Sequence, residues 1–182
     1  MGHKHSKEEI LAGAMEAAVA DGLSNLTFGR LSRRLGVSDR MIVYYFPNKD
    51  ALITEVLLLL GAHLQEALME AFSGHAADHM ALARRAWPVL AQPRFDATFG
   101  VFFEANGLAA TGRQPYQAIV AGLVEAWVAW LAPLFEGDEA FCRAQAEATL
   151  VLVDGLLLLR QLAGAEAAQR AAVALGVGKP AQ

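Results

Sequence analysis

The sequence has few of the residues and runs that build disulfides, metal clusters or membrane spans. Cys142 is its one cysteine, which excludes an internal disulfide and a cysteine-based metal cluster. The longest apolar runs, 56–60 and 148–159, fall short of the roughly 18 residues that a membrane span requires, and Asp154 interrupts the second. The first residues contain no apolar segment of the kind found in signal peptides. We therefore expect a soluble, cytoplasmic protein with no membrane partner.

Valine and isoleucine are sparse compared with alanine and leucine, although 55% of the residues are hydrophobic. Alanine and leucine are strong helix formers, so the composition favours an all-α fold. With 182 residues, the chain is long enough for one large helical domain, or for a small domain joined to a larger one. We find no strand pattern, internal repeat or low-complexity segment.

The net charge of −4 hides an uneven distribution of charged residues. Residues 1–49 contain seven Lys and Arg against five Asp and Glu, whereas residues 50–182 contain eight against fourteen. Within 30–49 there are five basic residues, and Asp39 is the one acidic residue. A basic segment on an acidic chain is expected where one end of a protein meets phosphate groups. An ordinary solvated surface is the alternative explanation.

Capping residues and glycines divide the first fifty residues into short helices. Ser6 opens a capping box, and the helix that follows it ends at Gly22. We expect Thr27 to cap a second helix that ends at Gly36, and Ser38 to cap a third. Two short helices joined by a Gly-Val turn are typical of a helix-turn-helix, whose second helix enters the major groove of DNA.

Longer helices are expected over the rest of the chain. A leucine-rich helix should run from 48 to about 72, before the break at Ser73 and Gly74. Further helices are predicted at about 76–91, 95–110, 115–132 and 139–163, with a weaker one ending near 175.

Two segments carry a family resemblance: Leu-Thr-Phe-Gly-Arg-Leu-Ser-Arg-Arg-Leu-Gly-Val-Ser at 26–38 and Tyr-Tyr-Phe-Pro-Asn-Lys-Asp-Ala-Leu at 44–52. Together they resemble the DNA-binding head of the TetR (tetracycline-repressor) family, and the similarity spans roughly residues 7–58. The resemblance implies an all-α fold, in which a three-helix head with a helix-turn-helix precedes a larger helical bundle. The predicted domains are a DNA-binding domain at 1–47, a connecting helix at 48–74, and an effector-binding and dimerisation domain at 75–182.

The resemblance also implies which residues contact operator DNA. Thr27 and Lys49 match positions where the family touches the phosphate backbone. Arg40 can bond the edge of a guanine and Met41 can meet a thymine methyl group, although a solvated Arg40 is an open alternative. The family usually has an aromatic residue at the position of Val43 and glycine or proline at the position of Arg40. The predicted DNA-binding residues are Thr27, Arg30, Ser38, Asp39, Arg40, Met41, Tyr44, Tyr45 and Lys49, with a packed, inward position left open for one of the two tyrosines.

Large aromatic residues recur at helical spacing between 87 and 135. Such a pattern forms either a packed core or the wall of an apolar cavity with a few polar groups. The resemblance favours the cavity, because C-terminal domains of the family bind small effectors. The predicted ligand-binding residues are Trp87, Phe99, Phe102, Phe103, Glu104, Asn106 and Trp127.

The helices at 115–132 and 139–163 are too apolar to be covered by one chain, unless they form a deeply buried core. In the family, the corresponding helices pair in a homodimer, whose two heads lie about 34–36 Å apart and read a palindrome. We therefore expect a ligand-responsive regulator, a repressor, that a small hydrophobic effector releases from its operator by moving the helix at 48–72. A regulator controlled by a protein partner, with no effector, is the alternative.

One segment raises the possibility of an enzyme. In His75-Ala-Ala-Asp78-His79, two imidazoles lie one helical turn apart, a spacing that can hold a metal ion. Tight metal sites need three or four ligands, and those further ligands are missing here. The sequence has no recognisable catalytic triad, cysteine nucleophile or glycine-rich phosphate loop. We expect a protein that is not an enzyme and has neither a metal site nor a cofactor.

Overall fold

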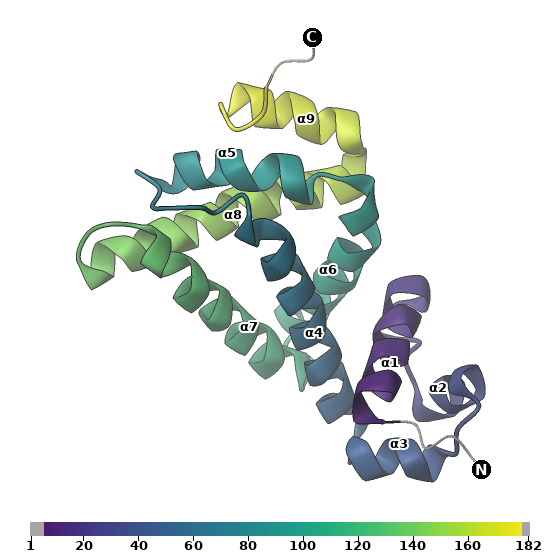
Figure 1. Cartoon of the computed structure of the whole chain (residues 1–182). Helices are drawn as coiled ribbons and strands as arrows, with labels where there is room; N and C mark the ends of the chain where they lie inside the picture. Colours follow the sequence, from purple (N-terminus) through teal and green to yellow (C-terminus); the bar gives the residue numbers. More distant parts are fainter. Residues whose placement is uncertain (1–5, 180–182) are drawn as a thin grey trace. The chain divides into compact units, whose positions relative to one another are not determined.

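The computed structural model describes residues 6–179 and confirms the all-α fold, since no strand forms within that range (Figure 1). There are two short 3₁₀ turns within the described residues. The first, η1 (Pro93–Phe95), precedes α6, and the second, η2 (Ala132–Leu134), follows α7. The helices are α1 (Lys7–Asp21), α2 (Phe28–Leu35), α3 (Asp39–Tyr45), α4 (Lys49–Met69), α5 (His79–Leu90), α6 (Asp96–Ala110), α7 (Tyr116–Leu131), α8 (Glu139–Ala163) and α9 (Ala165–Ala174).

The helices pack into two compact units. The first contains 6–63 together with 100–119, and the second contains 64–99 together with 120–179. Helices α4, α6 and α7 each continue from one unit into the other. The division of the sequence into consecutive domains at 1–47, 48–74 and 75–182 stays a prediction. Packing groups residues differently, because 100–119 belongs with the first unit.

The beginnings of the first helices follow from side-chain caps. The Ser6 hydroxyl accepts a hydrogen bond from the Glu9 amide (3.2 Å), and the Glu9 carboxylate accepts one from the Ser6 amide (2.9 Å), which confirms the capping box. Thr27 caps α2 through the Arg30 amide (3.3 Å). Gly36 ends α2 in the left-handed region, with φ of 68°, where glycine is favoured. These local rules account for the two short helices at their predicted places.

Apolar side chains fill the space between α1, α2 and α3. Leu31, Ile42 and Phe46 are buried in the core of the head, and Phe28, Leu35 and Val37 are half-buried. Gly13 allows Leu35 to approach α1, because a Cβ at Gly13 would lie 2.4 Å from Leu35 Cδ2. This close packing fixes α2 against α1 and leaves the far side of α3 exposed.

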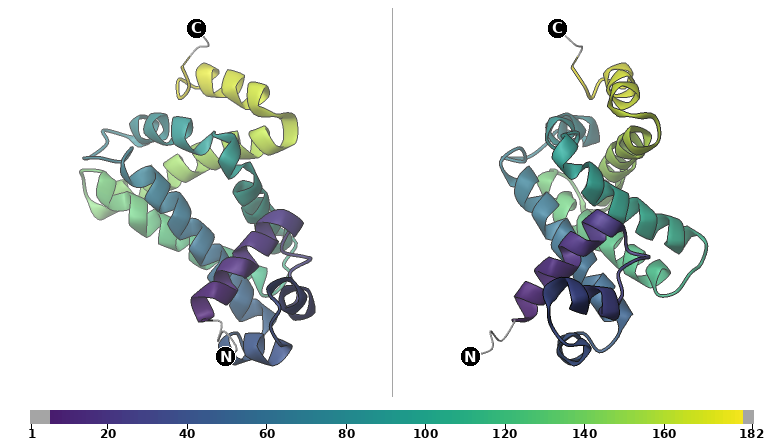
Figure 2. Two further views of the ribbon diagram at one scale, coloured as in Figure 1. Left: turned by 45° about the vertical axis from the view of Figure 1, so that its right-hand side comes forward. Right: turned by 90° about the vertical axis from the view of Figure 1, so that its right-hand side faces the viewer.

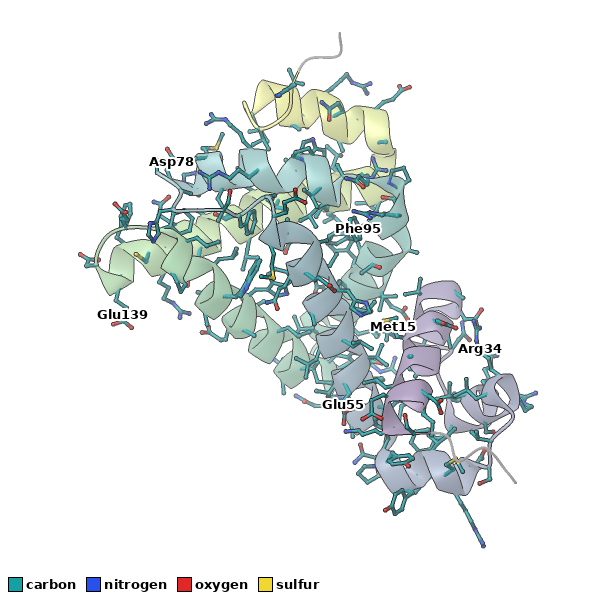
Figure 3. The ribbon with its side chains drawn as sticks, viewed as in Figure 1. Met15, Arg34, Glu55, Asp78, Phe95 and Glu139 are labelled. Atoms are coloured by element: carbon teal, nitrogen blue, oxygen red, sulfur yellow. The ribbon has the colours of Figure 1, made fainter. Side chains whose placement is uncertain are left out.

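In the second unit, α8 packs against α5 and α9, as the views in Figures 1 and 2 agree. Figure 3 shows Asp78 and Glu139 at the beginnings of α5 and α8. The helix predicted from Ala76 begins instead at His79, because the Asp78 carboxylate caps it through the Ala81 amide (2.7 Å). The Ala76 amide donates to the Leu134 carbonyl (2.8 Å), which holds that residue in an extended, bridging conformation.

Hydrogen bonds fasten α9 and the segment after it to α5. The buried Trp87 indole donates to Gln169 Oε1 (3.0 Å), and the Gln169 amide group donates to the Lys179 carbonyl (2.8 Å). The Arg84 guanidinium donates to the Gly176 carbonyl (2.7 Å). The last described residues are therefore part of the packed second unit.

Candidate nucleic-acid interface

Helix α3 turns one face inward and the other to solvent. Ile42 is fully buried on the inner face. The outer face consists of Asp39, Arg40, Val43 and Tyr44, all of them exposed. Tyr44 is 81% exposed, so its phenol is accessible from solvent. This face combines a cation, an apolar side chain and a phenol, the groups that read base edges and sugars in a major groove.

The other residues predicted on α3 lie beside this face. Met41 and Tyr45 are half-buried. The rings of Tyr44 and Tyr45 contact each other edge to face, with their centroids 5.0 Å apart and their planes at 78°. Tyr45 therefore packs beside the projecting Tyr44. Of the two tyrosines, Tyr45 is the one that turns partly inward.

Three polar groups lie at the beginnings of the helices around α3. Thr27 is exposed, and its hydroxyl oxygen is the cap acceptor of α2, which leaves the hydroxyl proton available to donate. Ser38 is exposed at the beginning of α3 and makes no side-chain cap bond. Lys49 begins α4, where the Asn48 side chain caps the Ala51 amide (2.8 Å). Two hydroxyls and an ammonium group are suitable donors for DNA phosphates.

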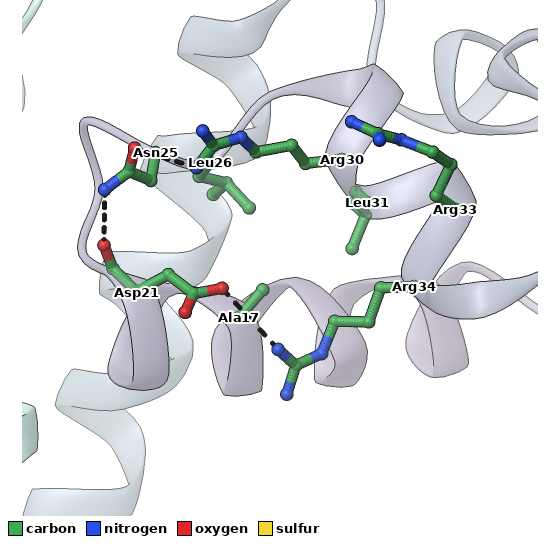
Figure 4. A pocket seen from close by; sticks show the side chains of 8 residues that line it. All are labelled: Ala17, Asp21, Asn25, Leu26, Arg30, Leu31, Arg33 and Arg34. Atoms are coloured by element: carbon green, nitrogen blue, oxygen red, sulfur yellow. Dashed lines mark hydrogen bonds and ion pairs between the residues drawn. The ribbon is translucent and has the colours of Figure 1, made fainter.

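A groove of about 520 Å³ runs along α1 and α2 on the flank of the head (Figure 4). Arg30 donates to the Asn25 side chain (2.8 Å), and the Asn25 amide group donates to the Asp21 carbonyl (2.8 Å). The Arg34 guanidinium lies 3.7 Å from the Asp21 carboxylate. The lining residues are Ala17, Asp21, Asn25, Leu26, Arg30, Leu31, Arg33 and Arg34, so three guanidinium groups and a single carboxylate give this flank a positive charge.

Comparison with known proteins assigns this head to a family. Residues 10–56 match the family model described as bacterial regulatory proteins, tetR family. The match covers most of α1, all of α2 and α3 and the beginning of α4, so it is the head of the chain that resembles this family. Within the match, α2 and α3 take the places of the two helices of a DNA-binding helix-turn-helix.

Solved structures resemble the chain beyond the head in fold. A curated relative, the HTH-type transcriptional regulator BetI of Serratia proteamaculans, is 29% identical over 73 residues, which cover 38% of this chain and 37% of that protein. A putative TetR-family regulator from Rhodococcus sp. superposes with a TM-score of 0.74 at 17% identity, covering 93% of this chain and 95% of the other. The multidrug binding protein EbrR, solved with imidazole, gives a TM-score of 0.65 at 23% identity, covering 100% and 96%. The match to the curated relative spans less than two fifths of its length, while these solved structures share the fold throughout.

The residues predicted to bind an effector are divided between the two units. Trp87, Phe99 and Trp127 belong to the second unit, and the other four, Phe102, Phe103, Glu104 and Asn106, belong to the first. Trp87 and Phe99 are buried, and Trp127 contacts Trp130 edge to face, with centroids 5.4 Å apart. None of the seven lines the groove on the head. Their role in ligand binding stays a prediction.

Glu104 has a clear structural role that the sequence did not indicate. Its carboxylate accepts hydrogen bonds from the amides of Leu23 and Ser24, each at 2.8 Å, and from the Ser24 hydroxyl. Burial raises the pKa of this carboxyl, but the bonds from Ser24 and Leu23 outweigh burial and hold the pKa below its ordinary value. The Glu104 carboxylate therefore holds the loop between α1 and α2, and its predicted contact with a ligand stays a prediction.

Two residues near the interface were missed, for different reasons. Val43 was noted only as a departure from the family, yet its position three residues after Arg40 places it on the same exposed face, so helical spacing could have found it. Asn25 joins Asp21 to Arg30 across a turn. Nothing in the sequence near Asn25 distinguishes it from an ordinary turn residue.

The histidines considered as metal ligands have other partners. His75 Nδ1 lies 3.2 Å from the Glu136 carboxylate, and His79 Nδ1 lies 2.9 Å from Gln145 Oε1. Asp78 caps α5. Within residues 6–179, no three His, Cys, Asp or Glu side chains gather as a metal site would require. The spacing of this segment is therefore explained by capping and helix pairing.

Proposed function

We propose that the protein is a ligand-responsive regulator, a repressor, that binds palindromic operator DNA as a homodimer in the cytoplasm and is released by a small hydrophobic effector. The observation that carries the proposal is the exposed face of α3, where Arg40, Val43 and Tyr44 project from a head whose core is fully formed. Thr27, Ser38 and Lys49 supply phosphate donors around that face.

The polar residues of the head suit distinct tasks on DNA. Arg40 is placed to donate to guanine O6 and N7, and Tyr44 and Val43 are placed to meet sugars and thymine methyl groups. Arg30 and Arg33 line the positive flank and add attraction for the backbone without sequence preference. Asp39 at the beginning of α3 disfavours phosphates close to it, which helps to fix the register of the helix.

The homodimer is supported by apolar surface on α7 and α8. Val151, Leu158 and Leu162 follow one face of α8 and are exposed, with 76% of Val151 and 77% of Leu162 accessible to solvent. Soluble proteins rarely leave such a stripe uncovered. A second copy of the chain is the proposed cover, through the predicted helices at 115–132 and 139–163, because an isologous contact buries the same stripe on both chains.

An apolar groove of about 550 Å³ continues this surface within the second unit. Val151 and Gly155 of α8 line it together with Leu175, which follows α9 and is half exposed. Two segments, Lys49–Met69 and Tyr116–Leu134, are also long and apolar enough to cross a membrane, but 44% of the first is buried within the fold. For Tyr116–Leu134, of which 11% is buried, pairing with a second chain covers the same apolar surface without a membrane.

The effector is proposed from chemistry and from relatives. The EbrR structure is described as a multidrug binding protein with imidazole bound. In this chain, Trp87, Phe99, Phe102, Phe103 and Trp127 are the proposed apolar contacts, and Asn106 remains a proposed polar group. Glu104 is the least suited of the seven, because its carboxylate already accepts three hydrogen bonds.

The test begins with selection of preferred duplexes from a random DNA library by the full-length protein. Arg40→Ala should weaken binding to the selected duplex by about 1–3 kcal/mol, roughly 5- to 150-fold, and relax the preference at one base pair of each half-site. Arg113→Ala is the matched control, since Arg113 is exposed in the same unit but lies outside α3 and should leave affinity nearly unchanged.

Fluorescence anisotropy at fixed salt measures both variants. If Arg40→Ala and the parent have equal affinities and an identical base preference, α3 is not the helix that contacts the bases. Failure of the parent protein to enrich any duplex would overturn the proposed function itself.

A further inference from the structure

The groove on the flank of the head gathers positive charge in a concave surface (Figure 4). The guanidinium groups of Arg30, Arg33 and Arg34 line it, and Asp21 supplies the one carboxylate among the lining residues. The lining residues therefore carry an excess of two positive charges. A hollow with charge of mainly one sign and low-dielectric walls focuses the electric field, so it attracts anions more strongly than a flat surface does.

Hydrogen bonds already orient two of these guanidinium groups. Arg30 Nη1 donates to Asn25 Oδ1 (2.8 Å), and the Asn25 amide group donates to the Asp21 carbonyl (2.8 Å). Arg33 Nε donates to the Gly29 carbonyl (3.0 Å). A guanidinium group has five N–H donors, and each of these two uses one of them in the bonds described, so donors remain for a ligand. Groups that are oriented in advance lose less conformational freedom on binding.

The third guanidinium group has a weaker partner. Arg34 Nη1 lies 3.7 Å from the Asp21 carboxylate, which is longer than a hydrogen bond, and both side chains are partly exposed to solvent. An incoming anion can therefore take Arg34 from Asp21 at little cost. The wall beside this pair is apolar and consists of the buried residues Ala17, Leu26 and Leu31.

The charge and size of the groove indicate the class of ligand. A phosphate monoester carries about two negative charges at neutral pH, which matches the excess of two positive charges. Its terminal oxygens accept paired hydrogen bonds from guanidinium groups. A phosphate of the DNA backbone is a diester with a single charge and matches less well. The volume of about 520 Å³ leaves room for a small organic group beside the phosphate.

We propose that this groove binds the phosphate monoester of a small molecule, with its three guanidinium groups around the phosphate oxygens. Asp21 competes with the ligand for Arg34 and so limits the affinity. None of the lining residues lies on α3, and none is among the residues proposed to bind a hydrophobic effector. The site is thus a second ligand site of the chain, and it does not rest on the proposed function.

Isothermal titration calorimetry on the full-length protein, without DNA, tests the site. The probe is phenyl phosphate, a monoester, and the matched ligand is methyl phenyl phosphate, a diester with one charge. At about 50 mM salt, where screening is weak, the monoester should bind with a dissociation constant below about 1 mM. The diester should bind at least about tenfold more weakly, because it has lost one charge and one acceptor oxygen.

Three variants assign the binding to the groove. Arg34→Gln should weaken phenyl phosphate binding by about tenfold, since it removes one of the three cations. Asp21→Asn should tighten binding by roughly threefold, because it removes the competing carboxylate. General damage to the head would not produce this opposite sign. Arg113→Gln is the control, since Arg113 is an exposed arginine of the same unit outside the groove and should leave the affinity unchanged.

Arg33→Gln should weaken binding as Arg34→Gln does, and it keeps the test decisive if Arg34→Gln does not fold. No saturable binding of phenyl phosphate to the parent, or equal affinity for the monoester and the diester, would overturn the site. An affinity unchanged in both Arg34→Gln and Asp21→Asn would place the anion elsewhere and overturn it too.

The DNA backbone is the other source of phosphate. If Arg34→Gln weakens binding to random duplexes while the parent does not bind phenyl phosphate, the groove serves the backbone alone and the inference is wrong. Because the calorimetry contains no DNA, failure of the parent to enrich any duplex would overturn the proposed function and leave this result intact.

Discussion

The two packing units expose opposite chemistry. The first presents arginines and a projecting tyrosine, Arg40 and Tyr44 among them, and most of its large apolar residues are inside, with Val43 and Leu58 as exposed exceptions. The second presents apolar side chains such as Val151 and Leu162, and uses polar groups such as Gln169 to join its own helices. The difference agrees with the two partners proposed for the protein, because a polyanion is bound by exposed donors and a protein partner by exposed apolar area.

The largest expected effect concerns the apolar surface. Val151→Glu places a carboxylate at the beginning of the α8 stripe on both chains, where burial of unpaired charge costs several kcal/mol. We expect the dimer dissociation constant to rise more than about 100-fold, which corresponds to roughly 3 kcal/mol. Sedimentation equilibrium measures the change.

Met69→Glu is the control for that substitution, since Met69 is an exposed apolar residue of α4 outside the stripe. A Val151→Glu protein that stays dimeric at the concentrations where the parent is dimeric would show that α8 is not the interface. The apolar surface of the second unit would then have no assigned partner.

The next effect concerns the loop that Glu104 holds. Gly22→Ala forces alanine into a φ of +83° and brings its Cβ to 2.9 Å from the Glu104 carboxylate. Backbone strain of this kind costs about 1–3 kcal/mol, and the contact adds to it. Urea unfolding should show a loss of stability in that range.

Gly29→Ala is the matched substitution in the same unit. A Cβ at Gly29 has open space around it in α2, so alanine should raise stability by up to about 1 kcal/mol through helix propensity. Equal changes in the free energy of unfolding for the two variants would contradict the special geometry of the loop at Gly22.

The smallest effect is a pH dependence that belongs to the first unit. The pKa of Glu104 is lowered in the folded protein from its ordinary value of 4.5, so its ionised form stabilises the fold above pH 4.5. This contribution is lost as the pH falls through the folded pKa. Glu104→Gln should therefore be less stable than the parent at pH 7, by about 1–2 kcal/mol for bonds to a partly exposed charged group.

Unfolding curves recorded from pH 7 down to pH 3 check the sign. The stability difference between the parent and Glu104→Gln should narrow below pH 4.5. A difference that is constant across that range would mean that the charge of Glu104 does not stabilise the loop.

The sequence predicts the head well because local interactions determine it. Ser6, Thr27 and Gly36 act within a few residues of themselves, through caps and a left-handed turn. The family motifs predict which residues of α3 face outward, and helical spacing supports the same residues. Helix α8 also has its predicted bounds, since Asp138 caps it and Gly164 ends it.

The remaining features depend on residues far apart in the chain. The beginning of α5 is displaced because Ala76 pairs with Leu134, and the role of Glu104 is set by Leu23 and Ser24, about eighty residues earlier. A carboxylate on a helix with aromatic neighbours is equally compatible with a ligand site and with a bond to a distant loop. Only the packed structure distinguishes the two.

The attachment of Glu104 to the α1–α2 loop has a consequence for modular recombination. Fusing the head of one regulator to the body of another is often imagined as a cut after the recognition helix. Here a transplanted head would arrive with Gly22, Leu23 and Ser24 but meet a foreign α6. A working chimera of this protein must inherit the acidic residue together with the loop, so the exchangeable module is discontinuous along the gene.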